Sequence, residues 1–327
     1  MSKVICFGSV GKDIFLPTGE GRIIETPEEL DSQKKLAFEL GAKVKIEERF
    51  EALGGVAANV AVGLKRLGVE AGCISNIGSD LIGKWVVEEL KKNGVETEAI
   101  KTEEGRVSDL SSIVVDKESA DRVIFTNKNS SGELNLDSPI TEEADWFFIA
   151  DVHGDWKQQV SSIVELARGK NKKLAFNPRE THIKENPEEV VKAMASCEVI
   201  FVNKDEAIEI ISSTGSFSPE ELNNEDFLLN KLAELGTKVV TLTDGKRGAW
   251  VSADGQTISS GEVEAPGKAL DSTGAGDGFA SGFLSAYIKG KDVAECLKWG
   301  IAQSTNVVTA YGAIDGLLTE EEILDRI

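Results

Sequence analysis

The sequence predicts an α/β fold with a doubly wound, mainly parallel sheet flanked by helices and a small β-sheet lid beside it. Short apolar runs alternate with helical patterns from about residue 145 onward, and this alternation is typical of a parallel sheet with helices on both faces. The lid is predicted by residues 17–50 and 107–126, which are more polar and contain stretches of alternating apolar and polar side chains. With 327 residues, of which 41% are hydrophobic, the chain is long enough to bury a large core.

The first strand and the first long helix are expected before residue 70. VICFG (4–8) is a short apolar run that predicts a buried strand. Apolar residues recur at helical spacing from Val56 to Leu67, and Gly68 follows in the position where glycine commonly ends a helix. This segment is therefore predicted to be an amphipathic helix.

We expect the lid to be formed by about residues 13–50 and about residues 105–127. In the first of these, AKVKIEERF (42–50) alternates apolar and charged side chains, as an extended segment would. In the second, VSDLSSIVVD and DRVIFTN predict a β pair joined by a short turn. No tandem repeat or low-complexity linker divides the chain, so residues 1–327 are predicted to form a single domain that carries the lid.

The second half of the chain is expected to supply four buried strands with helical patterns between them. Ligands bind at the carboxyl ends of strands in doubly wound sheets. Polar residues that directly follow these strands are therefore candidates for a site. The four runs are WFFIA (146–150), KLAFN (173–177), EVIFVN (198–203) and KVVTLTD (238–244).

The composition excludes several classes of partner. The formal net charge is −20, and binding to nucleic acid or to an anionic membrane needs clustered Lys and Arg, so we expect neither partner. No run approaches the ~18 apolar residues of a membrane span, and the apolar run near the N-terminus is shorter than that of a secretory signal. The four cysteines are far apart and form no CxxC pair. We therefore expect a cytoplasmic protein without a disulfide framework or a zinc site.

The stretch DSTGAGDGF (271–279) is the main candidate for a functional site. Apolar residues at helical spacing follow it, which predicts a helix from near Gly276 to about Lys289. Backbone N–H groups at such a helix entry can hold an anion. Asp277 would lie beside that anion hole, where a carboxylate can take a proton from a hydroxyl that attacks phosphorus. A simple turn, in which Asp277 stabilises the helix N-terminus by about 0.3–1 kcal/mol, explains the local pattern equally well.

Several motifs together resemble the ribokinase-like (PfkB) carbohydrate kinase family. DSTGAGDGF is similar to the family's hallmark, with Ser272 where threonine is more common, and LGGVAANVAVGLKRLG (53–68) resembles its N-terminal sugar-site motif. FVNKDEA (201–207) is similar to the NxxE motif and TLTDGKRGAW (241–250) to the TxGxxG nucleotide loop. The resemblance covers nearly all of the chain. It implies a ribokinase-like fold and an ATP-dependent kinase that transfers the γ-phosphoryl group to a hydroxyl of a small sugar.

The resemblance also implies roles for the matching residues in phosphoryl transfer and sugar binding. Asp277 would be the general base, which agrees with the interpretation reached from the residues alone. The backbone N–H groups that would hold the phosphoryl group belong to Gly274, Ala275 and Gly276. The implied sugar contacts are Asp13, Gly54, Gly55 and Asn59, with Arg179, Asp151 and His153 as further candidates for binding substrate or phosphate after strand ends.

The nucleotide side of the site is implied by the remaining motifs, with ATP and Mg²⁺ as cofactors. Asn203 and Glu206 would support Mg²⁺ and its waters near the ATP phosphates. An Asn cap with a capping-box Glu three residues later is the structural alternative for this pair. The other implied contacts are Thr243, Gly245 and Gly248 for the nucleotide phosphates, and Asp271 and Thr273 for the K⁺ ion that some family members bind.

Four questions stay open at the level of sequence. The long segment 17–50 also suits a nucleoside kinase of the adenosine kinase type, and a catalytically silent sensor of sugar or nucleotide is a second alternative. Lids of this family often pair, so a homodimer through an exposed edge of the lid sheet is a third expectation. A sugar-phosphate kinase would need an extra anion site in the lid. The basic residues available for it are Lys12, Lys34, Lys35, Lys43, Lys45 and Arg49.

Overall fold

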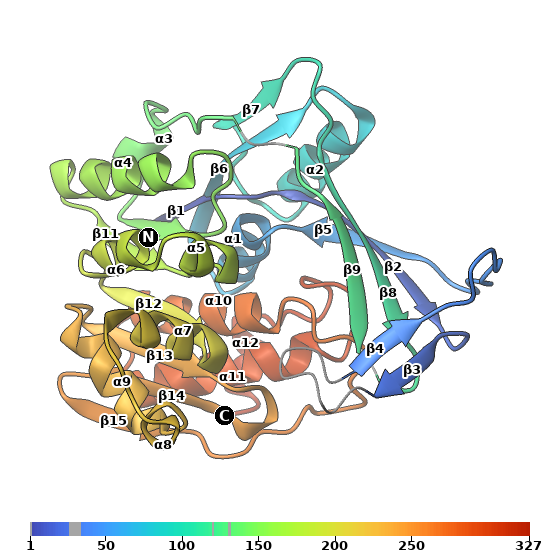
Figure 1. Ribbon diagram of the computed structural model, residues 1–327. Coiled ribbons are helices and arrows are strands. Elements are labelled where there is room, and N and C mark those ends of the chain that lie inside the picture. The colour runs from blue at the N-terminus through green and yellow to red at the C-terminus, as the bar shows by residue number, and fades with distance from the viewer. Residues whose placement is uncertain (1, 26–33, 120, 130–131) are drawn as a thin grey trace.

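A nine-stranded sheet forms the centre of the molecule in the computed structural model, which describes residues 2–25, 34–119, 121–129 and 132–327 (Figure 1). The strand order is β15-β14-β13-β12-β11-β10-β1-β6-β7. All neighbours from β13 to β7 are parallel, whereas β14 pairs antiparallel with β13 and β15. The strands are β1 (Lys3–Phe7), β6 (Glu70–Gly78), β7 (Ile100–Glu103), β10 (Trp146–Ile149), β11 (Lys173–Phe176), β12 (Val199–Asn203), β13 (Val239–Thr243), β14 (Ala249–Ala253) and β15 (Gln256–Ser259).

Helices cover both faces of this sheet, as a doubly wound fold requires. Two separate apolar clusters fill the spaces between the sheet and its two helical layers. One layer contains α1 (Val56–Arg66), α2 (Leu81–Lys92), α10 (Ala275–Ile288), α11 (Val293–Val307) and α12 (Glu320–Leu324). The other contains α3 (Ile140–Glu143), α4 (Trp156–Gly169), α5 (Glu180–Glu185), α6 (Pro187–Met194), α7 (Lys204–Thr214), α8 (Pro219–Leu222) and α9 (Glu225–Glu234).

These observations confirm the predicted α/β fold. The four strands expected in the second half of the chain are β10 to β13, and their ends lie within one residue of the predicted bounds. Their runs are apolar throughout because both faces of the strands are covered by helices. Within the described ranges, no helix combines the length and the apolar character that a membrane crossing requires.

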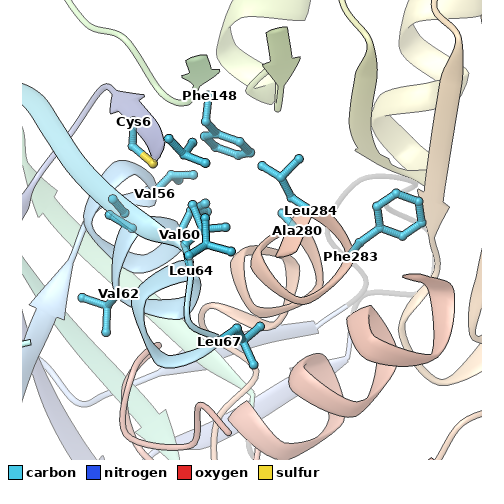
Figure 2. Packing of buried hydrophobic residues seen from close by; sticks show 14 of the residues in the cluster. Cys6, Val56, Val60, Val62, Leu64, Leu67, Phe148, Ala280, Phe283 and Leu284 are labelled. Atoms are coloured by element: carbon cyan, nitrogen blue, oxygen red, sulfur yellow. The ribbon is translucent and has the colours of Figure 1, made fainter. Parts of the chain in front are cut away.

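Helix α1 packs against α10 through the apolar face that its spacing predicts. Figure 2 shows Val60 and Leu64 of α1 near Leu284 of α10, and all three side chains are fully buried. The helices approach closely at Gly63, where a Cβ would lie 2.3 Å from the hydroxyl oxygen of Ser281. This close packing fixes the start of α1 relative to the start of α10.

A second, smaller sheet stands to one side of the main layer (Figure 1). Its strand order is β5-β2-β8-β9, with β2 parallel to β8 and the other pairs antiparallel. One face has its own apolar core of Phe15, Ala52, Ile113 and Val115. The strands are β2 (Gly11–Thr18), β5 (Phe50–Gly54), β8 (Asp109–Asp116) and β9 (Arg122–Asn127), and a separate hairpin is formed by β3 (Arg22–Glu25) and β4 (Lys34–Ala37).

The small sheet differs from the prediction at one segment. Residues 42–50 were expected to be extended, but only Phe50 belongs to a strand. Pairing of β5 with β2 begins at the Phe50 and Phe15 pair, so residues 42–49 have no neighbouring strand in the described part of the chain and their alternation leads to partial burial only. The expected lid segment 13–50 also includes residues 26–33, which lie outside the described residues.

Candidate active site

A cavity of about 410 Å³ lies at the carboxyl ends of the central strands. Its wall combines side chains from β2, β8 and β9 of the small sheet with residues that follow β1, β10 and β11 of the main sheet. This is the end of a doubly wound sheet at which ligands bind. The predicted site residues that line the cavity are Asp13, Gly55, Asn59, Asp151, Arg179, Asn203, Thr273, Gly274, Ala275, Gly276 and Asp277.

The glycine-rich loop enters α10 in a conformation that needs glycine. Gly274 is the N-cap residue and has a φ of 77°, in the left-handed region. A Cβ at Gly274 would lie 2.2 Å from the Cβ of Ala313, so the backbone passes too close for any side chain. The first N–H groups of a helix have no acceptor within the helix. Here Ala275 and Gly276 border the cavity, and the N–H of Ala275 makes a long hydrogen bond of 3.4 Å to the carbonyl oxygen of Ser272.

Asp277 lies in the first turn of α10 and borders the same cavity. The side-chain amide of Asn59, on α1, donates a hydrogen bond of 2.7 Å to Oδ2 of Asp277. Burial raises the pKa of Asp277 to about 6, although the Asn59 hydrogen bond and the positive charge of Arg179 act in the opposite direction. A raised pKa makes this carboxylate a stronger proton acceptor while it stays ionised at neutral pH.

Asn59 was predicted as a sugar contact, and the structure gives it a second partner in Asp277. Its Nδ2 is used by that carboxylate, whereas its Oδ1 is buried and has no partner among the described residues. A buried acceptor without a partner is costly. Asn59 can therefore orient Asp277 with one side of its amide and accept a hydrogen bond from a bound hydroxyl with the other.

The pKa of Asp277 predicts a pH dependence. A base must be deprotonated, so kcat/KM is expected to rise as the pH increases through about 6 and to level off above it. Because the negative charge of Asp13 also raises the pKa of Asp277, Asp13→Asn should move the midpoint of the profile to lower pH. The measurement is kcat/KM for the acceptor between pH 5 and 8 at saturating ATP and Mg²⁺, and a flat profile would contradict the assignment.

Asp13 and two glycines form another part of the wall. Asp13, on β2, is only 8% exposed, and burial raises its pKa to about 6 against the hydrogen bond from Ser111. A Cβ at Gly54 would lie 2.4 Å from the carboxyl carbon of Asp13, and a Cβ at Gly55 would lie 2.4 Å from a backbone oxygen. Gly54 thus allows the chain to pass directly beside the Asp13 carboxylate, and Gly55 allows it to pass beside Ser9.

Asp151 is the centre of a charged cluster that the sequence revealed only in part. The hydroxyl of Ser9 donates to its carboxylate at 2.6 Å, and the ammonium of Lys128 lies 3.2 Å from Oδ2. Burial opposes ionisation of Asp151, but the charges of Lys128 and Arg179 lower its pKa to about 2. Lys128 Nζ also lies 3.1 Å from Nε2 of His153. Asp151 is therefore a permanent anion that holds Lys128 at the cavity.

Ser9 and Lys128 were missed by sequence reasoning. They lie 142 and 23 residues from Asp151, so no local pattern connects them. A signal was available for Ser9 alone, because it follows the end of β1, where active-site residues of this fold often lie. Lys128 directly follows β9 and brings a positive charge from the small sheet to the main sheet.

Asp271 forms a turn rather than lining the cavity. Its Oδ1 accepts hydrogen bonds from the N–H and the hydroxyl of Thr273, at 3.1 and 2.8 Å. Arg122 of β9, which was not predicted, lies 3.8 Å from the same oxygen and also donates to the hydroxyl of Ser272. The other oxygen, Oδ2, is buried without a partner in the described part of the chain.

The predicted nucleotide loop lines a second cavity of about 90 Å³. Thr243, Gly245 and Gly248 form one side, and Ala275 and Gly276 belong to both this cavity and the larger one. At Gly248, φ is 104° and a Cβ would lie 1.8 Å from the carbonyl oxygen of Gly261. The start of α10 therefore lies between this small cavity and the larger one.

Asn203 and Glu206 form the capping box that was the structural alternative for this pair. Asn203 Oδ1 accepts the N–H of Glu206 at 2.9 Å, and Glu206 Oε2 accepts the N–H of Asn203 at 2.9 Å. Burial raises the pKa of Glu206 to about 7. The described residues contain no group of three His, Cys, Asp or Glu side chains that could hold a metal ion. A single carboxylate suits Mg²⁺, which usually keeps several waters and is bound mainly through phosphates.

Three of the basic residues considered for a sugar-phosphate site lie beside acids. Lys12 and Arg49 both pair with Glu51. Lys45 lies 3.9 Å from Glu47. The side chain of Lys34 lies outside the described residues. The cavity itself is lined by Lys12, Arg122, Lys128 and Arg179, so a sugar phosphate stays an alternative acceptor.

The geometry suits one enzyme class: a carboxylate in the first turn of a helix, beside a cavity lined by the backbone of the helix entry, is an arrangement that fits a small-molecule kinase. Residues 32–320 match the pfkB family carbohydrate kinase, and the chain belongs to that family. It is a phosphotransferase of the carbohydrate kinase kind.

Relatives and solved structures agree with this membership. The chain is 27% identical over 265 residues to an uncharacterized sugar kinase of Archaeoglobus fulgidus, covering 78% of this chain and 98% of that protein. It is 26% identical over 290 residues to a nucleoside kinase of Methanocaldococcus jannaschii, covering 88% and 90%. The crystal structure of a ribokinase from Cryptococcus neoformans in complex with ADP superposes with a TM-score of 0.78 at 20% identity, covering 100% of both chains. The ribokinase-like fold is thereby confirmed.

Proposed function

We propose that the protein transfers the γ-phosphoryl group of ATP to a hydroxyl of a small sugar, with Asp277 as the general base. The observation that carries the proposal is the position of Asp277, in the first turn of α10 and hydrogen-bonded to Asn59 at 2.7 Å in the wall of the acceptor cavity. There the carboxylate can take the hydroxyl proton while the N–H groups of residues 274–276 stabilise the charge on the phosphoryl oxygens.

The proposed cofactors are ATP with Mg²⁺, and K⁺ is a further candidate. An adenine nucleotide is supported by the ribokinase relative that binds ADP and by the second cavity beside the start of α10. Glu206 would hold Mg²⁺ through water, where the ion would neutralise charge on the phosphates. Backbone carbonyls at Asp271 and Thr273, in the turn before α10, would be the ligands for K⁺. The free, buried cysteines favour the cytoplasm as the compartment.

A small polyhydroxylated acceptor suits the cavity better than a nucleoside. In the described chain, the apolar groups that line it are aliphatic and none is aromatic, whereas a base is commonly held by stacking on an aromatic ring. The acceptor groups Asp13 and Asn59 Oδ1 suit hydroxyl donors. Phosphorylation of a nucleoside is the second candidate reaction, because one relative is a nucleoside kinase. A catalytically silent sensor is less well supported, because a protein that only binds sugar or nucleotide would not need a general base such as Asp277.

We also propose that residues 1–327 form one domain in which the small sheet is the lid of the acceptor cavity. Alternate residues of β9, from Arg122 to Thr126, and Lys128 after it face this cavity, so a shift of the sheet would open or close it. Closure of such a lid would exclude water from the transferring group.

One experiment tests the reaction and its acceptor. ADP formation from ATP and Mg²⁺ is measured with a panel of free sugars, sugar acids, sugar phosphates and nucleosides, with and without K⁺. Turnover with a free sugar above all others is expected. Preference for a nucleoside or a sugar phosphate would mean that the acceptor belongs to that class and is not a free sugar. Nucleotide binding without any turnover would favour the sensor.

The lid is tested by hydrogen exchange. If binding of the acceptor protects the amides of β9 from exchange, the small sheet acts as the lid.

A homodimer through the small sheet is proposed from its exposed edge. Strand β9 is an edge strand, and its outward side chains Val123 and Phe125 are 36% and 62% exposed. Unpaired apolar edges favour association with another strand. We expect a dimer in sedimentation experiments and a monomer after Phe125→Glu, with Phe125→Leu as the apolar control. A monomeric wild type would contradict the proposal.

A further inference from the structure

The segment that follows α11 contacts both the anion hole and the small sheet. We call residues 308–313 the strap. It leaves the last turn of α11 and runs between the glycine-rich loop and the apolar core of the small sheet. The glycine-rich loop and the small sheet come from opposite ends of the chain, so any coupling between them must pass through tertiary contacts such as these.

On one side, the strap supports the anion hole. The carbonyl of Val308 accepts hydrogen bonds from the N–H groups of Leu270 and Asp271, at 2.8 and 3.4 Å. Ala313 is 1% exposed and lies so close to Gly274 that a Cβ there would reach 2.2 Å from its own Cβ. The backbone that would hold the phosphoryl group therefore rests directly on the strap.

On the other side, the strap packs against the core of the small sheet. The ring of Tyr311 stacks on Phe50 of β5, with centroids 4.6 Å apart and an interplanar angle of 24°. Gly312 has a φ of 95°, and a Cβ there would lie 2.7 Å from the Cβ of Ala52. The Tyr311 ring also lies 6.4 Å from the ring of Phe15, so it packs against both β5 and β2.

We propose that the strap connects the position of the small sheet to the geometry of the anion hole, and that Tyr311 is a positioning residue for phosphoryl transfer. The inference rests on the proposed function for its kinetic consequence but not for its structural one. Displacement of β5 would move Tyr311 and Gly312, and Ala313 would transmit that shift to Gly274 because the two touch without space between them. An anion hole is sensitive to such shifts, since a misplacement of about 1 Å can cost ~10²-fold in rate.

Hydrogen exchange of the loop amides tests the connection without any acceptor. In Tyr311→Ala, amides of residues 271–278 should exchange about two- to tenfold faster, the factor expected when an aromatic pair is lost. Phe50→Ala, which changes only the small sheet, should give the same effect. The double variant should show no further increase, because both changes break one contact. Tyr311→Phe keeps the ring and should behave like wild type. Phe217→Ala is the matched control, because it breaks another aromatic pair, Phe217 with Phe227, in the helical layer on the other face of the main sheet.

Kinetics supply the second readout, with the best acceptor from the panel. Tyr311→Ala should lower kcat about tenfold through the displaced anion hole, with the KM for ATP within about twofold of wild type, and Tyr311→Phe should restore kcat. Unchanged loop exchange in both Tyr311→Ala and Phe50→Ala would overturn the proposal. If Tyr311→Ala does not fold, Phe50→Leu gives the same comparison. Faster loop exchange with no acceptor found in the panel would support the strap while contradicting the proposed function.

Discussion

Asp277→Asn is expected to lower kcat by about 10²- to 10⁴-fold, the usual contribution of a general base, and to leave ADP affinity close to that of wild type. Asparagine has nearly the same shape and its side-chain oxygen can still accept the hydrogen bond from Asn59. It cannot take a proton from the acceptor hydroxyl. The change therefore removes proton transfer while it keeps the packing of the first turn of α10.

Single-turnover phosphoryl transfer and ADP titration measure the two halves of this prediction. Asp226→Asn is the matched control, because Asp226 is an exposed carboxylate in the first turn of another helix, α9. It should keep wild-type kcat. If Asp277→Asn turned over at more than about a tenth of the wild-type rate, the assignment of Asp277 as the base would be wrong.

Five strands of the central sheet, β1 and β10 to β13, and helix α1 could be predicted because their signals are local. Strands β10 to β13 are short apolar runs, and both of their faces are buried, so their bounds follow from the sequence alone. The face of α1 from Val56 to Leu67 is apolar because it packs against α10 and β1. Residues 42–49 misled the prediction, because alternation marks a strand only where a neighbouring strand exists to pair with it.

The glycine positions of the candidate site could be predicted from the sequence, whereas its ion pairs could be predicted only in part. Gly54, Gly55, Gly274 and Gly248 stand where another atom comes within 2.5 Å of a Cβ position, and glycine-rich motifs record such approaches directly. Lys128 is different, because its ion pair with Asp151 joins separate segments and leaves no pattern in either. Cations that meet acids across a fold are therefore found only once the fold is known.

The pair Asn203 and Glu206 shows that one sequence pattern can predict two different roles. The same spacing of three predicts a capping box and a magnesium support, and the structure contains the capping box. The cap does not exclude the other role, since the raised pKa of Glu206 reflects burial that a nearby cation would offset. A helix cap and a magnesium support need the same spacing of three residues, so the sequence alone does not distinguish them. A structure with bound Mg²⁺ and nucleotide would.

Gly274→Ala is expected to lower kcat by about 10²- to 10³-fold, the loss found when one anion-hole donor is removed. The added methyl would lie 2.2 Å from the Cβ and 2.6 Å from the Cα of Ala313, and the residue would also need a positive φ of 77°. The loop must therefore move away from the strap and carry the N–H groups of Ala275 and Gly276 with it. Steady-state kinetics measure the loss of kcat, and the midpoint of thermal unfolding measures the loss of stability caused by the clash and the positive φ.

Two further variants separate the clash from the cost of the positive φ. Gly255 has a φ of 75° with nothing within 4 Å of a Cβ, so Gly255→Ala should cost about 1–2 kcal/mol of stability and keep wild-type kcat. In the background of Gly274→Ala, Ala313→Gly removes the nearest atom but leaves the strap backbone in the way of the added methyl, so it should restore only part of the activity. Full activity in Gly274→Ala alone would mean that the loop tolerates displacement. The anion hole would then not depend on the close approach of Gly274 to Ala313.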